Sequence, residues 1–231
     1  MTKLALIGLG AVTRNIHLPA YAQLRDIATV IAGCDPDANA RAAAALPATY
    51  STPDEMFAKE NPDIAVICTP PSLHRAHTLL ALARGCHVFC EKPLVESLAE
   101  VDALAASAAK AGRGISVNTQ FNWMPIYTAA REKIGSPDFG RLMFLHARQN
   151  FRTTAATESG WRSAMKQRIA FEFGVHVFEL IRFFFRCDPV SVTIPTSVNQ
   201  ARSDIGSRFD PSSRSSRAES SLAGISQGSD P

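Results

Sequence analysis

The sequence predicts an α/β fold with a parallel sheet that is covered by helices on both faces. Two signals agree on this: the alternation of apolar runs with helix-like segments, and the residues that mark where helices begin and end. Over the first half of the chain, apolar runs of strand length alternate with helix-like segments. These runs are almost continuously apolar, as is typical of parallel strands covered by helices on both sides. We therefore expect a doubly wound domain over about residues 1–120.

The elements of this domain can be placed in order. Thr52 and Ser97 each begin a capping box, "TPDE" and "SLAE", so each should start a helix. Gly85 and Gly112 suit left-handed helix ends, and Pro19 should end or kink the first helix. The expected strands are Lys3–Ile7, Thr29–Cys34, Ala48–Tyr50, Ile64–Cys68, His87–Cys90 and Ile115–Val117.

Residues 121–194 predict a second, smaller and incomplete α/β domain. "MPIYTAAREKIG" and the strongly apolar "RIAFEFGVHVFELIRFFF" indicate helices, while "GRLMFLHARQNF" and "DPVSVTI" indicate strands. From residue 195 to residue 231 serine is the commonest residue and apolar periodicity is lost. Such a segment buries too little surface to offset its ordering entropy, so we expect a disordered tail.

Composition narrows the function classes. The chain has 231 residues, 46% of them hydrophobic, and a formal net charge of only +3. No basic run or basic-aromatic interleaving is present, so neither nucleic acid nor an anionic membrane is an expected partner. A small-molecule ligand is favoured.

Cysteine usage and the start of the chain predict a cytoplasmic protein. The five cysteines include no CxxC pair, and Cys34, Cys68 and Cys90 lie in apolar runs as buried structural thiols do, so no metal site is expected. The first strand begins at Lys3, which leaves no room for a signal region, and no apolar stretch approaches the ~20 residues of a membrane span.

The first strand ends in a glycine turn, "LALIGLGAV", that is typical of dinucleotide sites. Gly8 permits the tight turn, Gly10 lets a pyrophosphate approach the backbone, and the helix start at Ala11 and Val12 supplies N–H groups and a positive dipole end. Thr13 stands at the third glycine position, so the fingerprint is incomplete. The alternative is a tight turn without a ligand.

Asp35 follows the second strand in "GCDPD", where an acidic residue can accept hydrogen bonds from an adenosine ribose. Its carboxylate would repel a 2′-phosphate, so NAD is favoured over NADP. The alternatives are a turn-forming role for Asp35 before Pro36 and, for the glycine turn, another nucleotide such as S-adenosylmethionine.

The fourth strand leaves the sheet through Thr69 and Pro70 in "VICTPPSLH". This segment should open into the crevice at the carboxyl edge, where open parallel sheets bind ligands. His74 either contacts the cofactor there or is an exposed histidine at a helix start.

Glu91 and Lys92 follow the fifth strand in "HVFCEKPL" and should emerge at the same edge, beside a nicotinamide. Pro93 disfavours helical geometry at Lys92 and makes a cis peptide bond attainable, which would aim the ammonium. A lysine beside a cationic ring should have a lowered pKa and could stabilise an alkoxide. The alternative is a surface ion pair.

Together, "IGLGAV", "HLPA", "CDPD", "TPPSLH", "GCHVFCEKPL" and "FEFGVHVFELIRF" resemble the glucose-fructose oxidoreductase / inositol dehydrogenase / MocA (Gfo/Idh/MocA) family over about residues 3–193. The resemblance implies a Rossmann domain and an α/β domain for substrate and oligomer contacts. It also implies that Lys92 is the catalytic lysine beside the nicotinamide and that His176 takes the substrate hydroxyl proton. Glu172, one turn earlier, stands where the family commonly has an aspartate and could orient His176.

The sequence departs from this family at several places. Thr13 replaces a glycine, and Gln167 and Arg168 stand where many members carry glycines. The family normally continues for another stretch of sheet where this chain has its serine-rich tail, which indicates a truncated or frame-shifted product. A shortened sheet exposes open edges, so a homo-oligomer is expected if the chain folds.

Two functions are therefore predicted. The first is an NAD(P)-dependent oxidoreductase that transfers a hydride between a nicotinamide cofactor and a sugar, cyclitol or related polyol. The second is a catalytically inactive NAD-binding fragment or interaction module.

Overall fold

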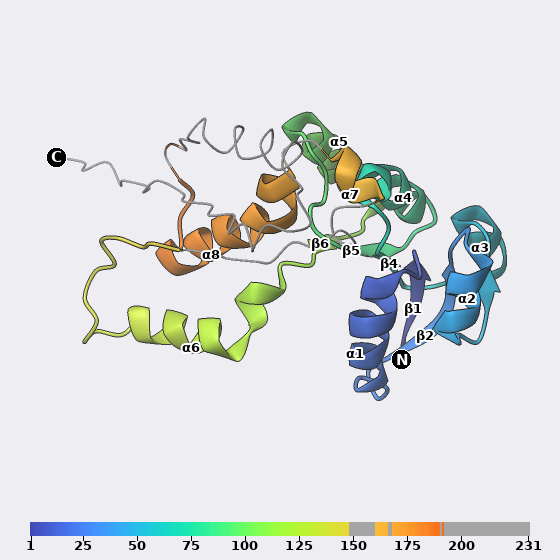
Figure 1. The fold of residues 1–231 in the computed structure, drawn as a ribbon, viewed down its shortest axis with the longest axis horizontal. Helices are drawn as coiled ribbons and strands as arrows, with labels where there is room; N and C mark the ends of the chain where they lie inside the picture. The colour runs from blue at the N-terminus through green and yellow to red at the C-terminus, as the bar shows by residue number, and fades with distance from the viewer. Residues whose placement is uncertain (148–159, 166–167, 190, 192–231) are drawn as a thin grey trace, which may run out of the picture. The chain divides into compact units, whose positions relative to one another are not determined.

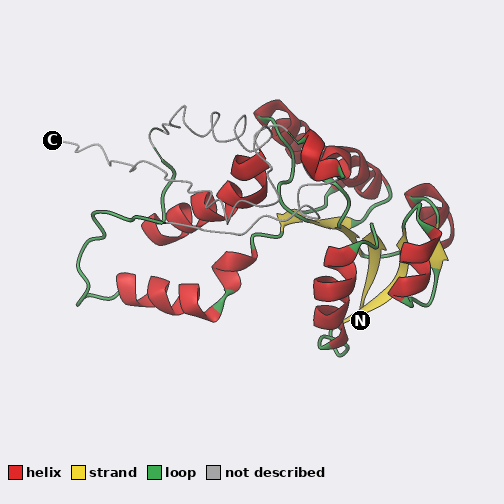
Figure 2. Ribbon diagram, in the orientation of Figure 1, coloured by secondary structure: helices red, strands yellow, loops and turns green. Residues whose placement is uncertain are grey.

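The computed structural model describes residues 1–147, 160–165, 168–189 and 191. The chain divides into two compact units, Met1–Asn118 and Thr119–Pro231 (Figure 1). The first unit carries the sheet, whereas the regular structure described in the second unit is helical (Figure 2).

The first unit contains a sheet of six parallel strands in the order β3-β2-β1-β4-β5-β6. This order reverses direction between β1 and β4, so the unit has the doubly wound topology that the sequence predicts, and all carboxyl strand ends meet at one edge. Each predicted strand is confirmed to within one residue at either end. The strands are β1 (Thr2–Ile7), β2 (Ala28–Cys34), β3 (Thr49–Tyr50), β4 (Ile64–Ile67), β5 (His87–Cys90) and β6 (Ile115–Val117).

Local signals fix the helix ends of this unit. The Thr52 hydroxyl accepts a hydrogen bond from the Glu55 N–H at 3.2 Å, and the Ser97 hydroxyl accepts one from the Glu100 N–H at 3.4 Å, so both predicted caps are confirmed. Gly112 ends its helix at φ 61°. The helices are α1 (Leu18–Ala22), α2 (Ala38–Ala44), α3 (Pro53–Lys59), α4 (Pro71–Ala83) and α5 (Leu98–Ala111).

Pro19 does not end the first helix, because a π-helical segment, η1 (Thr13–His17), immediately precedes it. A proline ring clashes with the carbonyl four residues earlier in a regular helix, and a wider π turn changes that spacing. This segment carries two buried polar side chains, Thr13 and His17.

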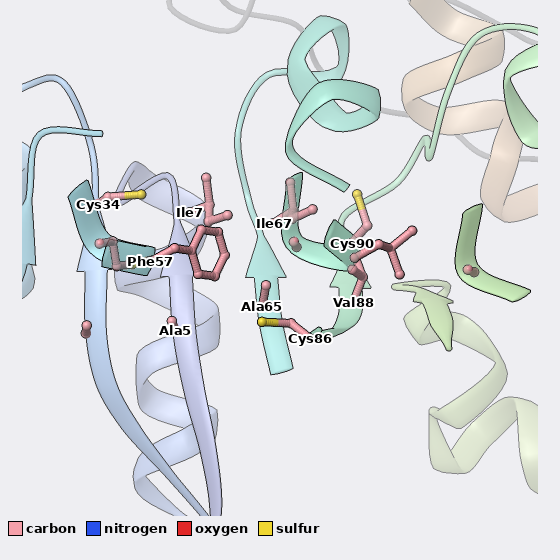
Figure 3. Close-up of a cluster of buried hydrophobic side chains, with 14 residues drawn as sticks. Ala5, Ile7, Cys34, Phe57, Ala65, Ile67, Cys86, Val88 and Cys90 are labelled. Carbon is pink, nitrogen blue, oxygen red and sulfur yellow. The ribbon is translucent and has the colours of Figure 1, made fainter. Parts of the chain in front are cut away.

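Alternation along the strands divides the apolar core into two layers. Ala5 and Ile7 of β1 belong to a cluster that includes side chains of α3, α4 and α5 (Figure 3), whereas Leu6 belongs to a cluster with side chains of α1 and α2. Of the three thiols expected to be buried, Cys34 and Cys90 are buried and Cys68 is only partly buried. Cys86 is buried in the same layer.

The second unit contains η2 (Gln120–Trp123), α6 (Pro125–Ile134), α7 (Trp161–Ala164), η3 (Ile169–Gly174) and α8 (Val175–Phe185). Both predicted helices are confirmed, the second with a π-helical start. Residues 140–147 form no strand, contrary to prediction, because a strand needs a neighbour for its backbone hydrogen bonds and the described part of this unit offers none. The rest of that strand, most of the strand predicted over 188–194 and the tail 195–231 lie outside the described residues.

None of the helices in the described ranges has the length and apolar character that crossing a bilayer requires.

Candidate functional site

The turn after β1 has the backbone that a phosphate cradle needs. Gly8 has φ 93°, and a Cβ at this position would lie 2.9 Å from the carbonyl carbon and oxygen of Cys68, so only glycine fits without a backbone shift. A Cβ on Gly10 would meet nothing within 4 Å. The space above Gly10 is therefore open to a ligand that approaches the backbone.

Thr13 takes over the structural task of the third glycine. Its hydroxyl donates a hydrogen bond of 2.7 Å to the carbonyl oxygen of Gly8, and its side chain is fully buried. The hydroxyl thus ties the start of the helix to the turn. The helix that begins at Ala11 and Val12 follows this turn directly, so its first N–H groups lie at the same edge of the sheet.

Asp35 is held beside the glycine turn. Its carboxylate accepts hydrogen bonds from the backbone N–H of Leu9 at 2.8 Å and from the N–H of Asp37 at 2.9 Å. The second bond forms the local turn that the sequence also allows for Asp35, and the first links the acid to the glycine turn as well. Arg41 donates to the carbonyl oxygens of Asp35 and Pro36 at 2.7 and 3.0 Å. The carboxylate therefore has a fixed position next to the cradle.

These residues fit an NAD cofactor. The open space above Gly10, the N–H groups of the helix start and the positioned carboxylate of Asp35 match the pyrophosphate and the ribose hydroxyls in chemistry and in chain order.

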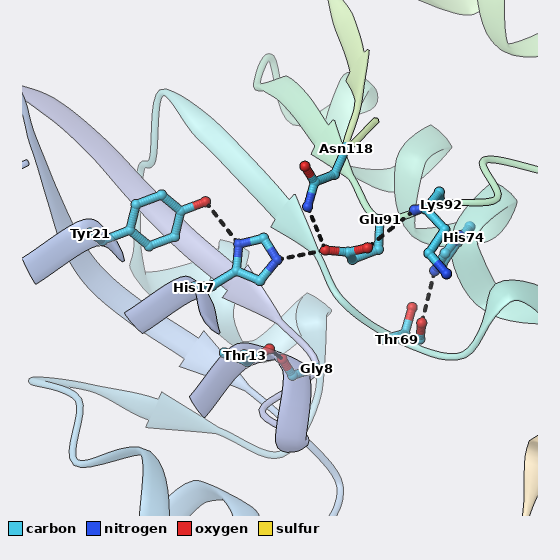
Figure 4. Close-up of polar contacts among 9 residues, drawn as sticks. All are labelled: Gly8, Thr13, His17, Tyr21, Thr69, His74, Glu91, Lys92 and Asn118. Atoms are coloured by element: carbon cyan, nitrogen blue, oxygen red, sulfur yellow. Dashed lines mark hydrogen bonds and ion pairs between the residues drawn. The ribbon is translucent and has the colours of Figure 1, made fainter. Parts of the chain in front are cut away.

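The segment after β4 is fixed by His74, which is buried rather than exposed at the helix start. Only 1% of its surface is exposed, and one ring nitrogen lies 2.7 Å from the carbonyl oxygen of Pro93. The other ring nitrogen lies 2.8 Å from the carbonyl oxygen of Thr69 (Figure 4). Thr69 also hydrogen-bonds His77 through its hydroxyl at 3.2 Å. Thr69 and Pro70 thus form a rigid connection from β4 to α4.

Glu91 is the centre of a polar network at the end of β5 (Figure 4). One carboxylate oxygen lies 2.8 Å from Nε2 of His17 and accepts a 2.7 Å hydrogen bond from the amide of Asn118. The other oxygen accepts a 3.3 Å hydrogen bond from the backbone N–H of Lys92. The peptide bond from Lys92 to Pro93 is cis. The side chain of Glu91 is only 12% exposed and that of His17 only 6%, so the contact between them is a buried one.

The network holds His17 and Glu91 in their charged forms. Burial by itself lowers the pKa of His17, but hydrogen bonds and attraction from Cys68 and Glu91 outweigh it and raise the pKa to about 10. Burial acts to raise the pKa of Glu91, whereas its bonds to His17 and Asn118 hold that pKa below the usual value. His17 is therefore an imidazolium, and Glu91 a carboxylate, at neutral pH.

In the second unit, His176 lies on α8 and is 6% exposed. Its ring stacks on that of Phe121, with centroids 4.4 Å apart and planes 16° from parallel. Phe121 in turn stacks on Tyr127 at 5.5 Å. An aromatic stack of this kind restricts the rotation of the imidazole and so fixes the direction of its nitrogens.

Glu172, one turn before His176, is bound by two arginines. Its carboxylate accepts hydrogen bonds from Nε of Arg162 at 2.7 Å and from Nε of Arg168. Burial acts to raise the pKa of Glu172, but the two guanidinium groups lower it below the usual value. Arg168, where many Gfo/Idh/MocA members carry a glycine, is thus a buried counter-charge, and Gln167 lies outside the described residues.

Sequence reasoning gave no role to His17 or Asn118. Both carried a usable signal: Asn118 directly follows β6 at the carboxyl edge, and His17 lies four residues after Thr13 on the helix that begins at the glycine turn. Lys92 belongs to the first unit and His176 to the second, and their convergence on one substrate remains a prediction.

Comparison with known proteins agrees with this description. Residues 2–119 match the family model described as an oxidoreductase family with an NAD-binding Rossmann fold, GFO_IDH_MocA. D-apiose dehydrogenase of Paraburkholderia graminis is 30% identical over 190 residues, which cover 78% of this chain and 49% of that protein. Inositol 2-dehydrogenase of Klebsiella pneumoniae is 28% identical over 83% of this chain and 57% of its own length. The chain spans about half the length of the curated relatives it matches.

Solved structures share the fold. A dehydrogenase from Chromobacterium violaceum superposes with a TM-score of 0.73 at 24% identity, over 84% of this chain and 57% of that one. The WlbA dehydrogenase of Thermus thermophilus, solved with NAD and UDP-GlcNAcA, gives a TM-score of 0.72 at 23% identity, over 84% of this chain and 66% of that one. The glycine turn, the EKP segment and the matched residues together show that this chain belongs to the Gfo/Idh/MocA family of oxidoreductases.

Proposed function

We propose that this chain is an NAD-dependent oxidoreductase that acts on a hydroxyl group of a sugar, cyclitol or related polyol. The observation that carries the proposal is the shared carboxyl edge of the sheet. The glycine turn after β1, the acid after β2 and the lysine after β5 all lie at that edge. The matched relatives support it, because their names are those of dehydrogenases for D-apiose, a D-glucoside and inositol.

The cofactor site would be formed by the first unit. The N–H groups around Gly10, Ala11 and Val12 bind the pyrophosphate, and Asp35 accepts hydrogen bonds from the adenosine ribose. Thr69, Pro70 and His74 shape the edge next to it, and Glu91 and Lys92 lie on the nicotinamide side. When bound, the nicotinamide supplies the hydride acceptor or donor.

Two side chains would handle the proton and the developing charge. The imidazole of His176 accepts the proton of the substrate hydroxyl, the general-base role that histidine most often takes in enzymes. The ammonium of Lys92 stabilises the negative charge that develops on a substrate oxygen. Glu172, held by its arginines, keeps the start of the His176 helix in place.

Asp35 makes NAD the preferred cofactor. A carboxylate that is already fixed beside the glycine turn repels the 2′-phosphate of NADP and accepts the 2′-hydroxyl of NAD. Calorimetric titration of Asp35→Ser with both cofactors tests this role. The preference for NAD should fall by about tenfold or more, which corresponds to about 1.4 kcal/mol. An unchanged preference would show that another group selects the cofactor.

Turnover is tested with purified protein, NAD and a panel of D-apiose, myo-inositol and a methyl D-glucoside, by following NADH absorbance. We expect one sugar or cyclitol to be oxidised. Lys92→Ala should lose about 10²–10³-fold in kcat, as removal of one oxyanion donor does, and should keep its affinity for NAD. Lys110→Ala, which removes an exposed lysine on α5, is the matched control and should retain full activity.

The outcomes separate the two predicted functions. Binding of NAD without turnover over the whole panel would favour an inactive NAD-binding module. Equal kcat in Lys92→Ala and wild type would remove Lys92 from the mechanism.

A further inference from the structure

Two buried histidines contact the segment that carries Lys92, and neither lies on the strand that precedes it. His17 comes from η1 and His74 from α4, and they are 5% and 1% exposed. Figure 4 shows His17 directed at Glu91 and His74 bonded to Thr69. With so little exposed surface, neither ring offers its nitrogens to a substrate, and each acts on the protein itself.

The first histidine fixes the residue before Lys92. His17 and Asn118 converge on one oxygen of the Glu91 carboxylate, at 2.8 and 2.7 Å, and the other oxygen accepts the N–H of Lys92 at 3.3 Å. The imidazolium-carboxylate bond is charge-assisted and therefore stronger than a neutral hydrogen bond. Through this bond, the position of the backbone nitrogen of Lys92 depends on His17, which lies 74 residues before Glu91 in the chain.

The second histidine fixes the residue after Lys92. One ring nitrogen of His74 lies 2.7 Å from the carbonyl oxygen of Pro93, and the other lies 2.8 Å from the carbonyl oxygen of Thr69. Carbonyl oxygens only accept hydrogen bonds, so both contacts direct the ring toward backbone and not toward a ligand. His74 thereby joins the connection after β4 to the connection after β5.

We propose that His17 and His74 are positioning residues that fix the backbone on both sides of Lys92 and so direct its ammonium group. The proposal rests on the proposed function for the catalytic importance of Lys92. A catalytic group has to be held to within about 0.5 Å of its productive position. Because the Lys92 side chain is long and flexible, only a fixed backbone limits the region that its ammonium group can reach.

The two ring nitrogens of each histidine can be tested separately. A glutamine amide nitrogen reaches the position of Nε2, whereas an asparagine amide nitrogen reaches that of Nδ1. His17→Gln therefore keeps a donor toward Glu91 and His17→Asn removes it. His74→Asn keeps a donor toward Pro93 and His74→Gln removes it.

A matched control is available on the same strand. His87 begins β5 at the opposite end from Lys92 and is exposed. His87→Asn should behave as wild type in every measurement. Thiol labelling of Cys34 and Cys90, which are buried in the core of the same unit, reports whether each variant is folded.

The direct measurement needs no substrate. Lys92 is acetylated with acetic anhydride at a series of pH values in the presence of NAD, and its modification relative to other lysines is quantified by mass spectrometry. His17→Asn and His74→Gln should change the labelling rate of Lys92 by about threefold or more, because the accessibility of its ammonium group depends on the backbone that the two histidines hold. His17→Gln and His74→Asn should stay close to wild type.

Turnover with the substrate found in the panel gives the second measurement. The kcat of His17→Asn and His74→Gln should fall by about tenfold or more, because small misplacements of a catalytic group have large costs. KM for NAD should change by less than about twofold, because the cradle at Gly8 and Gly10 is untouched.

Wild-type labelling and wild-type kcat in folded His17→Asn and His74→Gln would overturn the proposal. Equal losses in the glutamine and asparagine variants of one histidine would also overturn it, since they would show that only the ring volume matters. If His17→Asn does not fold, Glu91→Gln examines the same contact from the other partner. Labelling differences without turnover in wild type would support the positioning role and reject the proposed function.

Discussion

The carboxyl edge of the first unit and the helix α8 of the second unit hold their polar side chains in different ways. At the sheet edge, Glu91 contacts His17 of η1, Asn118 after β6 and the backbone of Lys92, so these bonds depend on where the strands end. His74 of α4 likewise contacts the backbone that follows β4 and β5. On and before α8, His176 is held by the ring of Phe121, and Glu172 by the guanidinium groups of two arginines.

This difference predicts which kind of substitution should damage each unit most. In the first unit a substitution that needs a backbone shift should do the most damage, whereas in the second a substitution that unbalances a buried charge should do so. The chain supplies a reporter for each unit. Its two tryptophans, Trp123 and Trp161, both belong to the second unit, and the buried thiols of Cys34 and Cys90 belong to the first.

Glu172→Gln should have the largest effect on stability. It leaves the guanidinium of Arg168, which is 8% exposed, without the carboxylate that compensates it. Removing one partner of a buried ion pair costs about 3 kcal/mol or more. Urea unfolding followed by tryptophan fluorescence should show this loss, while labelling of Cys34 should be unchanged.

The control for this variant is Glu132→Gln, which removes an exposed carboxylate on α6. It should leave the unfolding transition unchanged. A loss below about 0.5 kcal/mol in Glu172→Gln, as for an ordinary surface substitution, would show that the arginines do not depend on this carboxylate.

Gly8→Ala should have the next largest effect. It should change the thiol labelling of the first unit and leave the tryptophan fluorescence of the second unit unchanged. The added Cβ would stand 2.9 Å from backbone atoms of Cys68 at φ 93°, and forced backbone strain costs about 1–3 kcal/mol. Faster labelling of Cys34, without a change in tryptophan fluorescence, would confirm that the damage is confined to the first unit.

Gly10→Ala is the matched comparison, because its Cβ would meet no protein atom within 4 Å. Its thermal stability should equal that of wild type, and its affinity for NAD, measured by calorimetry, should fall. Unchanged NAD affinity would place the pyrophosphate elsewhere.

The smallest effect should be the pH dependence of the His17–Glu91 pair. The pKa of His17 is raised from 6.5 to about 10, so its contribution to stability is fully present below pH 6.5 and is lost as the pH rises through about 10. The pKa of Glu91 is lowered from 4.5, so its contribution is present above pH 4.5 and is lost as the pH falls through the lowered value. The pair therefore stabilises the first unit most between these two ordinary values.

Thermal unfolding followed by circular dichroism between pH 6 and pH 10 checks whether stability falls as His17 loses its proton. The midpoint of wild type should fall by about 2–4 °C more than that of His17→Gln, which corresponds to about 1 kcal/mol. His87→Asn, whose amide oxygen can take the place of Nδ1 as acceptor for the Gly114 N–H, should follow wild type. Parallel curves for wild type and His17→Gln would show that the pair does not contribute to the pH dependence.

The sequence predicted the strands of the first unit and the residues at their ends, because these depend on local signals. Apolar runs mark buried strands, and glycine, proline and serine mark where helices begin and end. The same reasoning missed His17 and Asn118, since their importance comes from a carboxylate 74 and 27 residues away in the chain. It was also wrong about a strand over residues 140–147, because β structure depends on a partner that one segment cannot specify.

Local sequence patterns specify the sheet, the edge at which its strands end and the residue types at that edge, because hydrophobic period and turn chemistry act over a few residues. The tertiary structure then determines which of these groups support one another. It bonds the Thr13 hydroxyl to the Gly8 carbonyl and joins His17 to Glu91. It also places the two ring nitrogens of His74 at the carbonyl oxygens of Thr69 and Pro93. A hydrogen bond requires two groups within about 3 Å, and only the packing of distant elements produces that proximity.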